Sequence, residues 1–363
     1  MTTIAQDLGF GEAEQEIKRA AAQVLAARAP AHVVHGMVAG PGVVTSQWDR
    51  ALWAEMVELG WPALAVPEQQ GGFGVALVGA VGLIEEVGRF AVPSPLPATL
   101  CATYLLRACA NAAAEELLAQ IAQGTKVALA VCDATGDWEN VGVEVRDGRL
   151  HGRAYFVQDA QKADVFVVRA SDGFYQVQAN AVAQLLPDRI VDLTRDQAQL
   201  VFEHTPAIRL GALQAWERAW PAILLVLAAD MVGAAEWQLQ TTAEYARTRV
   251  QFERTLGFFQ AVKHPLVNMM LAIDRAKTLL YEAACLWDED RQDASMVARM
   301  AKVAASDAAG LCSDRSVQLH GGVGFTWECF VQIYFKRQQH TLGLYGDGTY
   351  QRAKLAEQIF LPL

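Results

Sequence analysis

The spacing of apolar residues divides the chain into three stretches. Up to about residue 123, apolar positions recur at helical spacing and are interrupted by glycine and proline turns. From about 124 to 210 they form short runs that partly alternate with polar residues, as in β-strands. After about residue 211 the helical spacing returns over much longer runs. This order predicts an α+β multidomain protein with an N-terminal helical domain (1–123), a small middle β-barrel-like domain (124–210) and a C-terminal four-helix bundle (211–363).

The C-terminal stretch predicts the longest helices of the chain. They are expected at residues 215–248, 260–288, 294–319, 329–342 and 348–359. Pro221 is compatible with the first of these because it falls in the opening turns. Long helices joined by short loops are typical of a bundle.

Shorter helices are predicted in the N-terminal stretch. Ser46 is a suitable N-cap for one that ends at Gly60, and an extended connector is expected at residues 61–67. Another helix covers residues 78–87 and should stop at Gly88, ahead of a proline-rich run. A last helical stretch is expected at 115–123.

Strands are predicted in the middle stretch, at residues 127–132, 141–145, 150–157, 165–170, 174–177 and 199–202. The tetrapeptide at 146–149, Arg-Asp-Gly-Arg, is a typical hairpin turn, because Asp-Gly accepts the left-handed conformation of a two-residue loop.

The composition argues against disorder and restricts the possible partners. Hydrophobic types make up 53% of the chain, so burial can offset the entropy of ordering. The net charge of −10 disfavours nucleic acid and anionic membranes as partners. The sequence shows no unbroken apolar run of the ~18 residues that a membrane span needs. The polar, acidic first residues do not resemble an export signal. We therefore expect a cytoplasmic protein with no membrane span.

The cysteines and histidines show no metal-site pattern. The 6 cysteines lie far apart without a CxxC pair, and the 7 histidines lack metal-ligand spacing. Reduced thiols, mostly packed as small core residues, are the simplest interpretation, and no metal is expected.

Two segments could hold a phosphorylated ligand. Arg249 closes the first long C-terminal helix and is followed by Phe252, Phe259 and Gln260. An arginine beside aromatic and amide side chains can bind a diphosphate and its attached ring. Alternatively, Arg249 caps the helix carbonyls and the phenylalanines are core residues.

The second segment runs from Gln318 to Glu328. Gly321 and Gly322 follow a helix directly, so their backbone amides could approach a ligand closely. The segment is neither a dinucleotide-binding fingerprint nor a P-loop. The alternative is a plain turn that ends the helix.

A candidate base lies near the C-terminus. Asp347 sits in a glycine-flanked turn, with Thr349 and Gln351 just inside the next helix. Its carboxylate could abstract a proton if an apolar cleft raised its pKa toward neutrality. Alternatively, Asp347 is a helix N-cap.

In this order the three segments resemble the acyl-CoA dehydrogenase family. Its pattern is Arg-x-x-Phe-Gly, then Phe-Gln, Gln-x-x-Gly-Gly and, near the C-terminus, Glu-Gly-Thr. Residues 59–74 and 85–89 also resemble the family's N-terminal domain, so the resemblance covers nearly the whole chain. It implies the family's fold, FAD as cofactor and α,β-dehydrogenation of an acyl-CoA thioester. It also implies an oligomer, usually a tetramer, and electron-transfer flavoprotein as electron acceptor.

The resemblance further assigns roles to single residues. Those expected to contact the FAD bound mainly by a neighbouring subunit are Arg249, Phe252, Phe259, Gln260, Gln318, Gly321 and Gly322. Thr349 and Gln351 would touch the chain's own flavin, and Asp347 stands where the family has its catalytic base.

The sequence departs from the family pattern at the chain's own site. Asp347 replaces a glutamate, and the position that other members use for the base is Ile223, with Glu217 about two turns away. The Thr-Glu-Pro-x-x-Gly-Ser-Asp and Trp-x-Thr segments of the β domain are replaced at 131–137 and 155–160. Glu253 stands where the family has a glycine after Phe252.

These departures resemble the smaller subunits of heteromeric α2β2 acyl-CoA dehydrogenases, which are associated with bulky substrates such as steroid-derived thioesters. The resemblance thus predicts a supporting subunit that completes a partner's FAD site. Two alternatives stay open: a self-sufficient homo-oligomeric dehydrogenase with Asp347 as base, and a non-enzymatic assembly subunit with the same fold. An acyl-CoA oxidase or nitroalkane oxidase is more distant.

Overall fold

The computed structural model describes residues 11–39, 47–139 and 142–360. The chain groups into two compact units. The helical unit consists of Met1–Val43, Leu77–Val92 and Leu224–Leu363, and the β-containing unit of Val44–Ala76 and Pro93–Ile223. The predicted boundaries at 123 and 210 stay predictions. Ser46, the predicted N-cap, lies outside the described residues.

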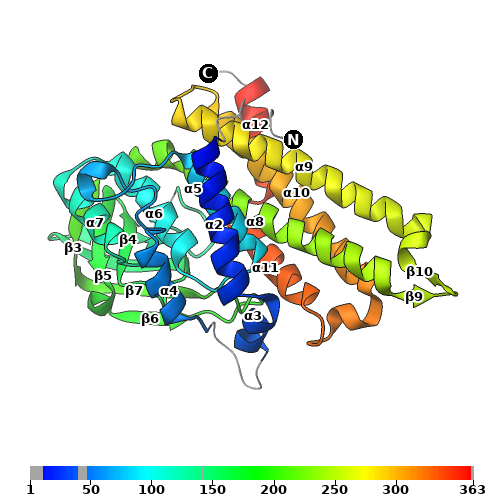
Figure 1. Cartoon of the computed structure of the whole chain (residues 1–363). Helices are drawn as coiled ribbons and strands as arrows, with labels where there is room; N and C mark the ends of the chain where they lie inside the picture. Colours follow the sequence, from blue (N-terminus) through cyan, green and yellow to red (C-terminus); the bar gives the residue numbers. More distant parts are fainter. Residues whose placement is uncertain (1–10, 40–46, 140–141, 361–363) are drawn as a thin grey trace. The chain divides into compact units, whose positions relative to one another are not determined.

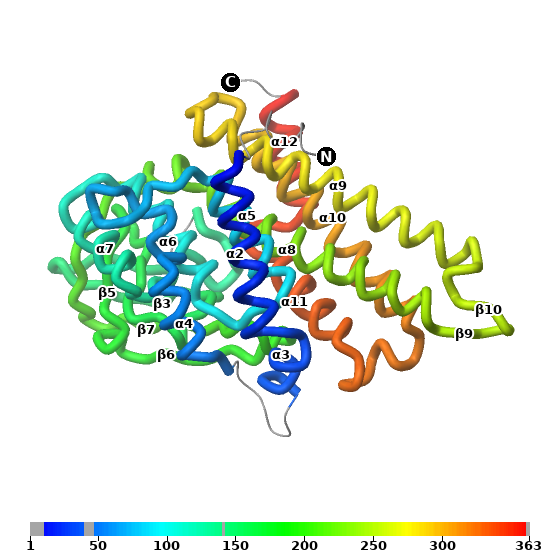
Figure 2. The backbone as a smooth tube through the Cα atoms, viewed as in Figure 1, coloured from blue at the N-terminus to red at the C-terminus, as the bar shows by residue number. Residues whose placement is uncertain are grey.

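The helical unit is built around long helices that pack side by side (Figures 1 and 2). Its helices are α2 (Glu12–Arg28), α3 (Ala31–Val38), α5 (Leu77–Arg89), most of α8 (Ala215–Thr248), α9 (Gln260–Asp288), α10 (Ala294–His320), α11 (Val331–Gly343) and α12 (Gly348–Phe360). A short hairpin, β9 (Val250–Gln251) with β10 (Arg254–Thr255), and the 3-10 turn η3 (Leu256–Phe258) join α8 to α9, and the 3-10 turn η4 (Gly321–Phe325) follows α10.

The long C-terminal helices confirm the sequence prediction. The bounds of α8 and α9 agree with it at both ends, and those of α10, α11 and α12 agree within two residues. Among the described helices, α8 alone is long and apolar enough to span a bilayer, which a search for unbroken apolar runs did not detect. Because 83% of its most apolar 18-residue stretch is buried inside the protein, α8 is best described as a core helix.

Helices α5 and α8 of this unit come into close backbone contact at two glycines. A Cβ atom on Gly88 would lie 2.1 Å from the backbone oxygen of Asp230, and one on Gly233 would lie 1.8 Å from that of Glu85. The prediction that Gly88 stops its helix is therefore wrong, since α5 continues to Arg89. Gly88 is instead required because α8 passes where its side chain would be.

The β-containing unit combines α4 (Arg50–Glu58), α6 (Leu96–Cys109) and α7 (Ala112–Ala122) with two four-stranded sheets. One sheet has the order β1 (Val127–Ala130), β4 (Val165–Ala170), β5 (Gly173–Gln178), β8 (Ile208–Gly211), and its β1–β4 pair is parallel. The other has the order β2 (Val143–Arg146), β3 (Arg149–Gln158), β7 (Gln197–Pro206), β6 (Gln184–Pro187). Phe166 and Phe202, one from each sheet, are buried in a common core.

Several local predictions in this unit need correction. Residues 61–67 form buried turns rather than an extended connector, with Leu64 N donating to Trp61 O. The N-cap of α4 is Asp49, whose carboxylate accepts from two backbone amides. Strands β6 and β8 and helix α6 were not predicted. The proline-rich run hid α6, although Pro97 is tolerated in its first turn.

We expect Gly233→Ala to destabilise the helical unit strongly. The new methyl group would overlap the backbone of α5, so we expect a loss of about 3 kcal/mol or more, at the upper end of overpacking costs. Unfolding in urea, followed by circular dichroism, measures it. Gly310→Ala is the matched control, because nothing lies within 4 Å of a Cβ at that helical position. It should be neutral or slightly stabilising, and equal stabilities of the two variants would contradict the assigned contact.

Candidate functional site

The hairpin after α8 ends in a two-residue turn with both residues in the left-handed region. Phe252 has φ 52° and Glu253 has φ 61°. A two-residue loop of this kind favours Asn and Gly, because side chains strain the left-handed conformation. The turn geometry thus explains why a glycine is expected after Phe252, and it shows that Glu253 takes up the same conformation at an energetic cost.

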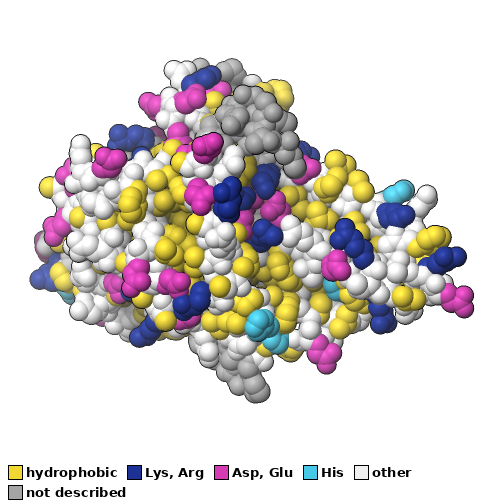
Figure 3. Space-filling view, in the orientation of Figure 1, with side chains coloured by type: hydrophobic (Ala, Val, Ile, Leu, Met, Phe, Trp, Pro, Cys, Tyr) yellow, Lys and Arg dark blue, Asp and Glu magenta, His cyan; other side chains and the backbone are white. Residues whose placement is uncertain are grey.

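Aromatic rings surround this turn. The Phe252 side chain is 87% exposed, and its ring meets that of Phe259 edge to face at 6.2 Å. The ring of Phe258 lies 5.5 Å from Phe259, and the guanidinium of Arg254 lies 5.2 Å above Phe258. Gln260, the first residue of α9, is exposed beside them. Figure 3 shows apolar and basic side chains gathered at this end of the helical unit.

Arg249 links α8 to this hairpin through its backbone. Its amide donates to Tyr245 O at 2.9 Å, and its carbonyl accepts from Leu256 N at 2.8 Å. The side chain is exposed, and within the described part of the chain its guanidinium has no hydrogen-bond or ion-pair partner. The guanidinium therefore stays available for a ligand, whereas the alternative of a helix cap is not seen.

The glycine segment lies beside the end of α8. The ring of Tyr245 stacks on that of His320 at 4.3 Å, directly before Gly321. Gly321 has φ 67°, and nothing lies within 4 Å of a Cβ at Gly321 or Gly322, so the backbone there is open to a ligand. Gln318 is exposed one turn earlier. Gly324 differs, because its Cβ would meet Val317 O at 2.8 Å.

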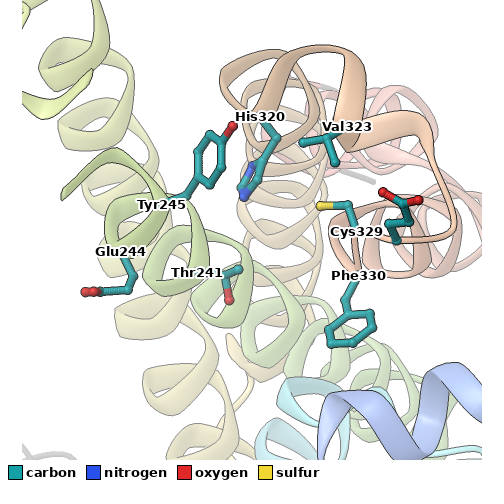
Figure 4. A pocket seen from close by; sticks show the side chains of 8 residues that line it. Thr241, Glu244, Tyr245, His320, Val323, Cys329 and Phe330 are labelled. Carbon is teal, nitrogen blue, oxygen red and sulfur yellow. The ribbon is translucent and has the colours of Figure 1, made fainter. Parts of the chain in front are cut away.

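A cavity of about 470 Å³ lies behind this segment (Figure 4). Tyr245 and His320 form part of its wall, with Val323 and Phe330 among the other lining residues. His320 Nδ1 lies 2.7 Å from Ser316 O, so the ring donates there and Nε2 is the acceptor. Burial lowers the pKa of His320, which favours the neutral ring.

We call the first cluster the hairpin-end cluster. It consists of Arg249, Phe252, Phe259, Gln260, Gln318, Gly321 and Gly322. The Tyr245–His320 stack places the Gly321 segment beside the end of α8, and the hairpin with Arg249 and Phe252 follows that helix directly. Sequence analysis identified their order, and the Tyr245–His320 stack that joins the two segments was missed.

Asp347, Thr349 and Gln351 form a second cluster at the start of α12. Asp347 Oδ1 accepts from Tyr350 N at 2.8 Å, so the carboxylate caps this helix and is exposed. Thr349 is exposed. Gln351 is fully buried: its Oε1 accepts from Arg299 at 2.7 Å and its Nε2 donates to Tyr345 O at 2.9 Å. Both ends of that amide are therefore used inside the chain.

The two clusters lie far apart along α10. Lys302 of α10 bonds Gly346 O, next to Asp347, and stands sixteen residues before Gln318. At ~1.5 Å per helical residue, this separation is about 24 Å. The two clusters therefore lie at separate places on the helical unit.

The remaining candidate bases are poorly placed. Ile223 is fully buried and apolar, and Glu217 is exposed on the first turns of α8. In the β-containing unit, the backbones of Cys132 and Tyr155 pair in an isolated antiparallel β-bridge. The two segments that differ from the family pattern, 131–137 and 155–160, therefore lie together. Phe156, which follows that bridge, has φ 55°.

Comparisons with known proteins cover nearly the whole chain. Residues 11–125 match the model described as acyl-CoA dehydrogenase, N-terminal domain, and residues 225–360 match acyl-CoA dehydrogenase, C-terminal domain. Acyl-CoA dehydrogenase IpdE2 of Mycobacterium tuberculosis is 32% identical over 90% of this chain and 91% of that protein. Among solved structures, a variant of the Tcur3481-Tcur3483 steroid ACAD is 26% identical, with a TM-score of 0.88 and 99% of each chain covered. The ChsE4-ChsE5 complex from M. tuberculosis, at 23% identity over 96% of this chain and 98% of that chain, shares the fold with a TM-score of 0.87.

We expect Asp347→Ala to destabilise the protein by about 1 kcal/mol, the usual cost of losing an N-cap. Asp347→Asn is the matched control, since asparagine caps a helix equally well. Thermal unfolding of the three proteins at one pH measures the effect. An alanine variant as stable as the asparagine variant would contradict the capping role.

Proposed function

This chain belongs to the acyl-CoA dehydrogenase family, and from that membership we propose that it is a supporting subunit of a hetero-oligomeric, FAD-dependent acyl-CoA dehydrogenase. In this role its hairpin-end cluster completes the FAD site of a partner chain. The family consists of oxidoreductases acting on CH–CH bonds of acyl-CoA thioesters, and its members typically bind FAD. Bound FAD supplies the hydride acceptor for that oxidation.

The hairpin-end cluster fits the diphosphate and adenosine side of FAD. The exposed Arg249 guanidinium can bind a diphosphate through two parallel hydrogen bonds. The open backbone at Gly321 and Gly322 lets amide groups approach phosphate oxygens, and Gln318 offers an amide beside them. Phe252 presents a free ring surface to a planar group. All residues of the hairpin-end cluster are exposed to solvent except Phe259, which is partly buried. This exposure is the observation that carries the proposal.

The second cluster supports a reduced role for the chain's own site. The Asp347 carboxylate is engaged as a helix cap, and the Gln351 amide is buried with both ends bonded. Asp347 is also one methylene shorter than the family's glutamate, and proton transfer is sensitive to reach at the scale of an ångström. Ile223 cannot replace it. Catalysis in the assembly therefore falls to a partner subunit.

The names of the relatives guide the proposed assembly and substrate. One solved relative, at 26% identity, is called a steroid ACAD and joins two components, Tcur3481 and Tcur3483. By analogy we propose a tetramer of two kinds of subunit that oxidises a bulky acyl-CoA such as a steroid-derived thioester, in the cytoplasm and with electron-transfer flavoprotein as acceptor.

A second candidate is a self-sufficient homo-oligomeric dehydrogenase with Asp347 as base. It is favoured by the exposure of that carboxylate, which a substrate could reach. Asp347→Asn tests it, because this variant retains the cap but not the base. A non-enzymatic assembly subunit is the third candidate.

The visible absorption spectrum of the purified chain distinguishes the candidates. Expressed alone, the supporting subunit should be nearly colourless, because only part of each flavin site is present. Coexpression with candidate acyl-CoA dehydrogenase chains of the same organism should yield a yellow complex that oxidises acyl-CoA. Stoichiometric flavin and turnover in the chain alone would establish the second candidate. A partner complex that never holds flavin would establish the third.

Within the complex, Arg249→Ala should lower FAD affinity by roughly ten- to a hundred-fold, the cost of a charge-assisted contact. Arg247→Ala is the matched control, because Arg247 is an exposed neighbour whose guanidinium pairs with Glu244 at 3.2 Å. Fluorescence titration of flavin-stripped complex with FAD measures both. If the two variants bind FAD equally, Arg249 does not hold the diphosphate.

A further inference from the structure

Lys302 is buried in α10, and no carboxylate among the described residues bonds it. Its side chain is fully buried, and none of the described residues forms an ion pair with it. Lys162 in the β-containing unit shows the usual solution, since it is equally enclosed but bonds Asp159 at 2.6 Å and Asp196 at 2.7 Å. A buried ammonium without such a partner is costly, so its place in the structure requires an explanation.

The Lys302 ammonium instead donates hydrogen bonds to two backbone carbonyls and a hydroxyl. Nζ donates to Leu342 O at 3.1 Å, to Gly346 O at 3.4 Å and to Ser306 Oγ at 3.5 Å. These three acceptors match the three donors of an ammonium group. Leu342 O belongs to the last turn of α11, where carbonyls lack helical partners and a positive charge is favourable.

The turn that Lys302 holds is strained. Tyr345 has φ 52° and Gly346 has φ 87°, so a bulky residue occupies the left-handed region. From α12, Gln351 holds Tyr345 O, and from α10, Lys302 holds Gly346 O. The next residue, Asp347, caps α12.

We infer that Lys302 is a positioning residue, which fastens the turn of residues 342–347 to α10 and so fixes where Asp347 and Thr349 are presented. The inference concerns the chain by itself. It holds whether the chain acts as a supporting subunit or as a complete enzyme, and its test needs neither flavin nor partner.

The surroundings of Lys302 make the stability of this attachment depend on pH. Burial lowers the pKa of Lys302 from 10.5 to about 8, although the Asp347 charge acts in the opposite direction. Four arginines on the adjoining helices contact groups other than Lys302. Arg352 of α12 and Arg275 of α9 pair with Asp307 of α10. Arg337 of α11 pairs with Asp230 of α8, and Arg299 of α10 donates to Gln351.

The sign of the pH dependence follows from these two pKa values. Opening the turn returns Lys302 to water, where its pKa is ordinary, so opening takes up a proton between about pH 8 and 10.5. Opening therefore becomes up to about tenfold less favourable per pH unit as the pH rises through this window. Below pH 8 both states carry the proton and the dependence disappears.

Limited proteolysis of the full chain tests the inference. The rate of cleavage within residues 343–349, followed by mass spectrometry, reports turn opening. Dividing the rate for Lys302→Met by that for the wild type cancels the protease's own pH profile. We expect this ratio to be constant below pH 8 and to rise by up to about tenfold per pH unit toward pH 10. A ratio that does not change with pH, or equal cleavage at pH 10, would overturn the inference.

Two controls keep the test decisive. Lys354→Met removes a partly exposed lysine on α12 that pairs with Glu357, and it should give a ratio near one at every pH. Should Lys302→Met fail to fold, the wild type alone suffices. Its cleavage within 343–349, relative to cleavage at the exposed α9–α10 loop at 289–292, must then fall between pH 8 and 10.

Discussion

The helical unit depends on the contact of α5 with α8 at Gly88 and Gly233. At this contact each helix backbone occupies the space of the other's missing side chain. The approach brings backbone carbonyls of Glu85 and Asp230 against the partner glycine, so both acidic residues are buried at the crossing. Two carboxylates removed from water each cost several kcal/mol unless they are paired.

Basic residues on further helices pair with those two carboxylates at the crossing. Lys18 of α2 and Lys277 of α9 bond Glu85 at 2.6 and 2.7 Å, and Arg337 of α11 makes a two-point contact with Asp230. Burial raises the pKa of Glu85, but the two lysines lower it to about 2, so it stays charged. One close helix crossing thus ties α2, α9 and α11 to α5 and α8.

The sequence predicted correctly those features that depend on apolar patterns extending over many consecutive residues. The bounds of α8 and α9 follow from apolar spacing over many turns, whereas the roles assigned to Arg249, Gln318 and Asp347 by motif spacing stay predictions. It misassigned Gly88 because a glycine in a helix looks the same whether it ends the helix or admits a neighbouring backbone. It could not indicate that Gln351 is enclosed by Arg299 and Tyr345, or that Lys302 holds a carbonyl forty-four residues away. Those contacts exist only once α10, α11 and α12 are packed.

The hairpin after α8 carries conformational strain at its tip. Phe252 and Glu253 both adopt the left-handed conformation, at roughly 1 kcal/mol each. Phe252 and Phe325 are left 87% and 79% exposed. Burying two such rings in an assembly would contribute about 2 kcal/mol each, which exceeds the strain of the turn. A tight, strained turn that displays an aromatic ring to solvent thus fits the proposed role, in which another molecule covers this surface. The negative charge of Glu253 at its tip then sets a requirement on that molecule, which must present water or a basic group opposite it rather than a phosphate.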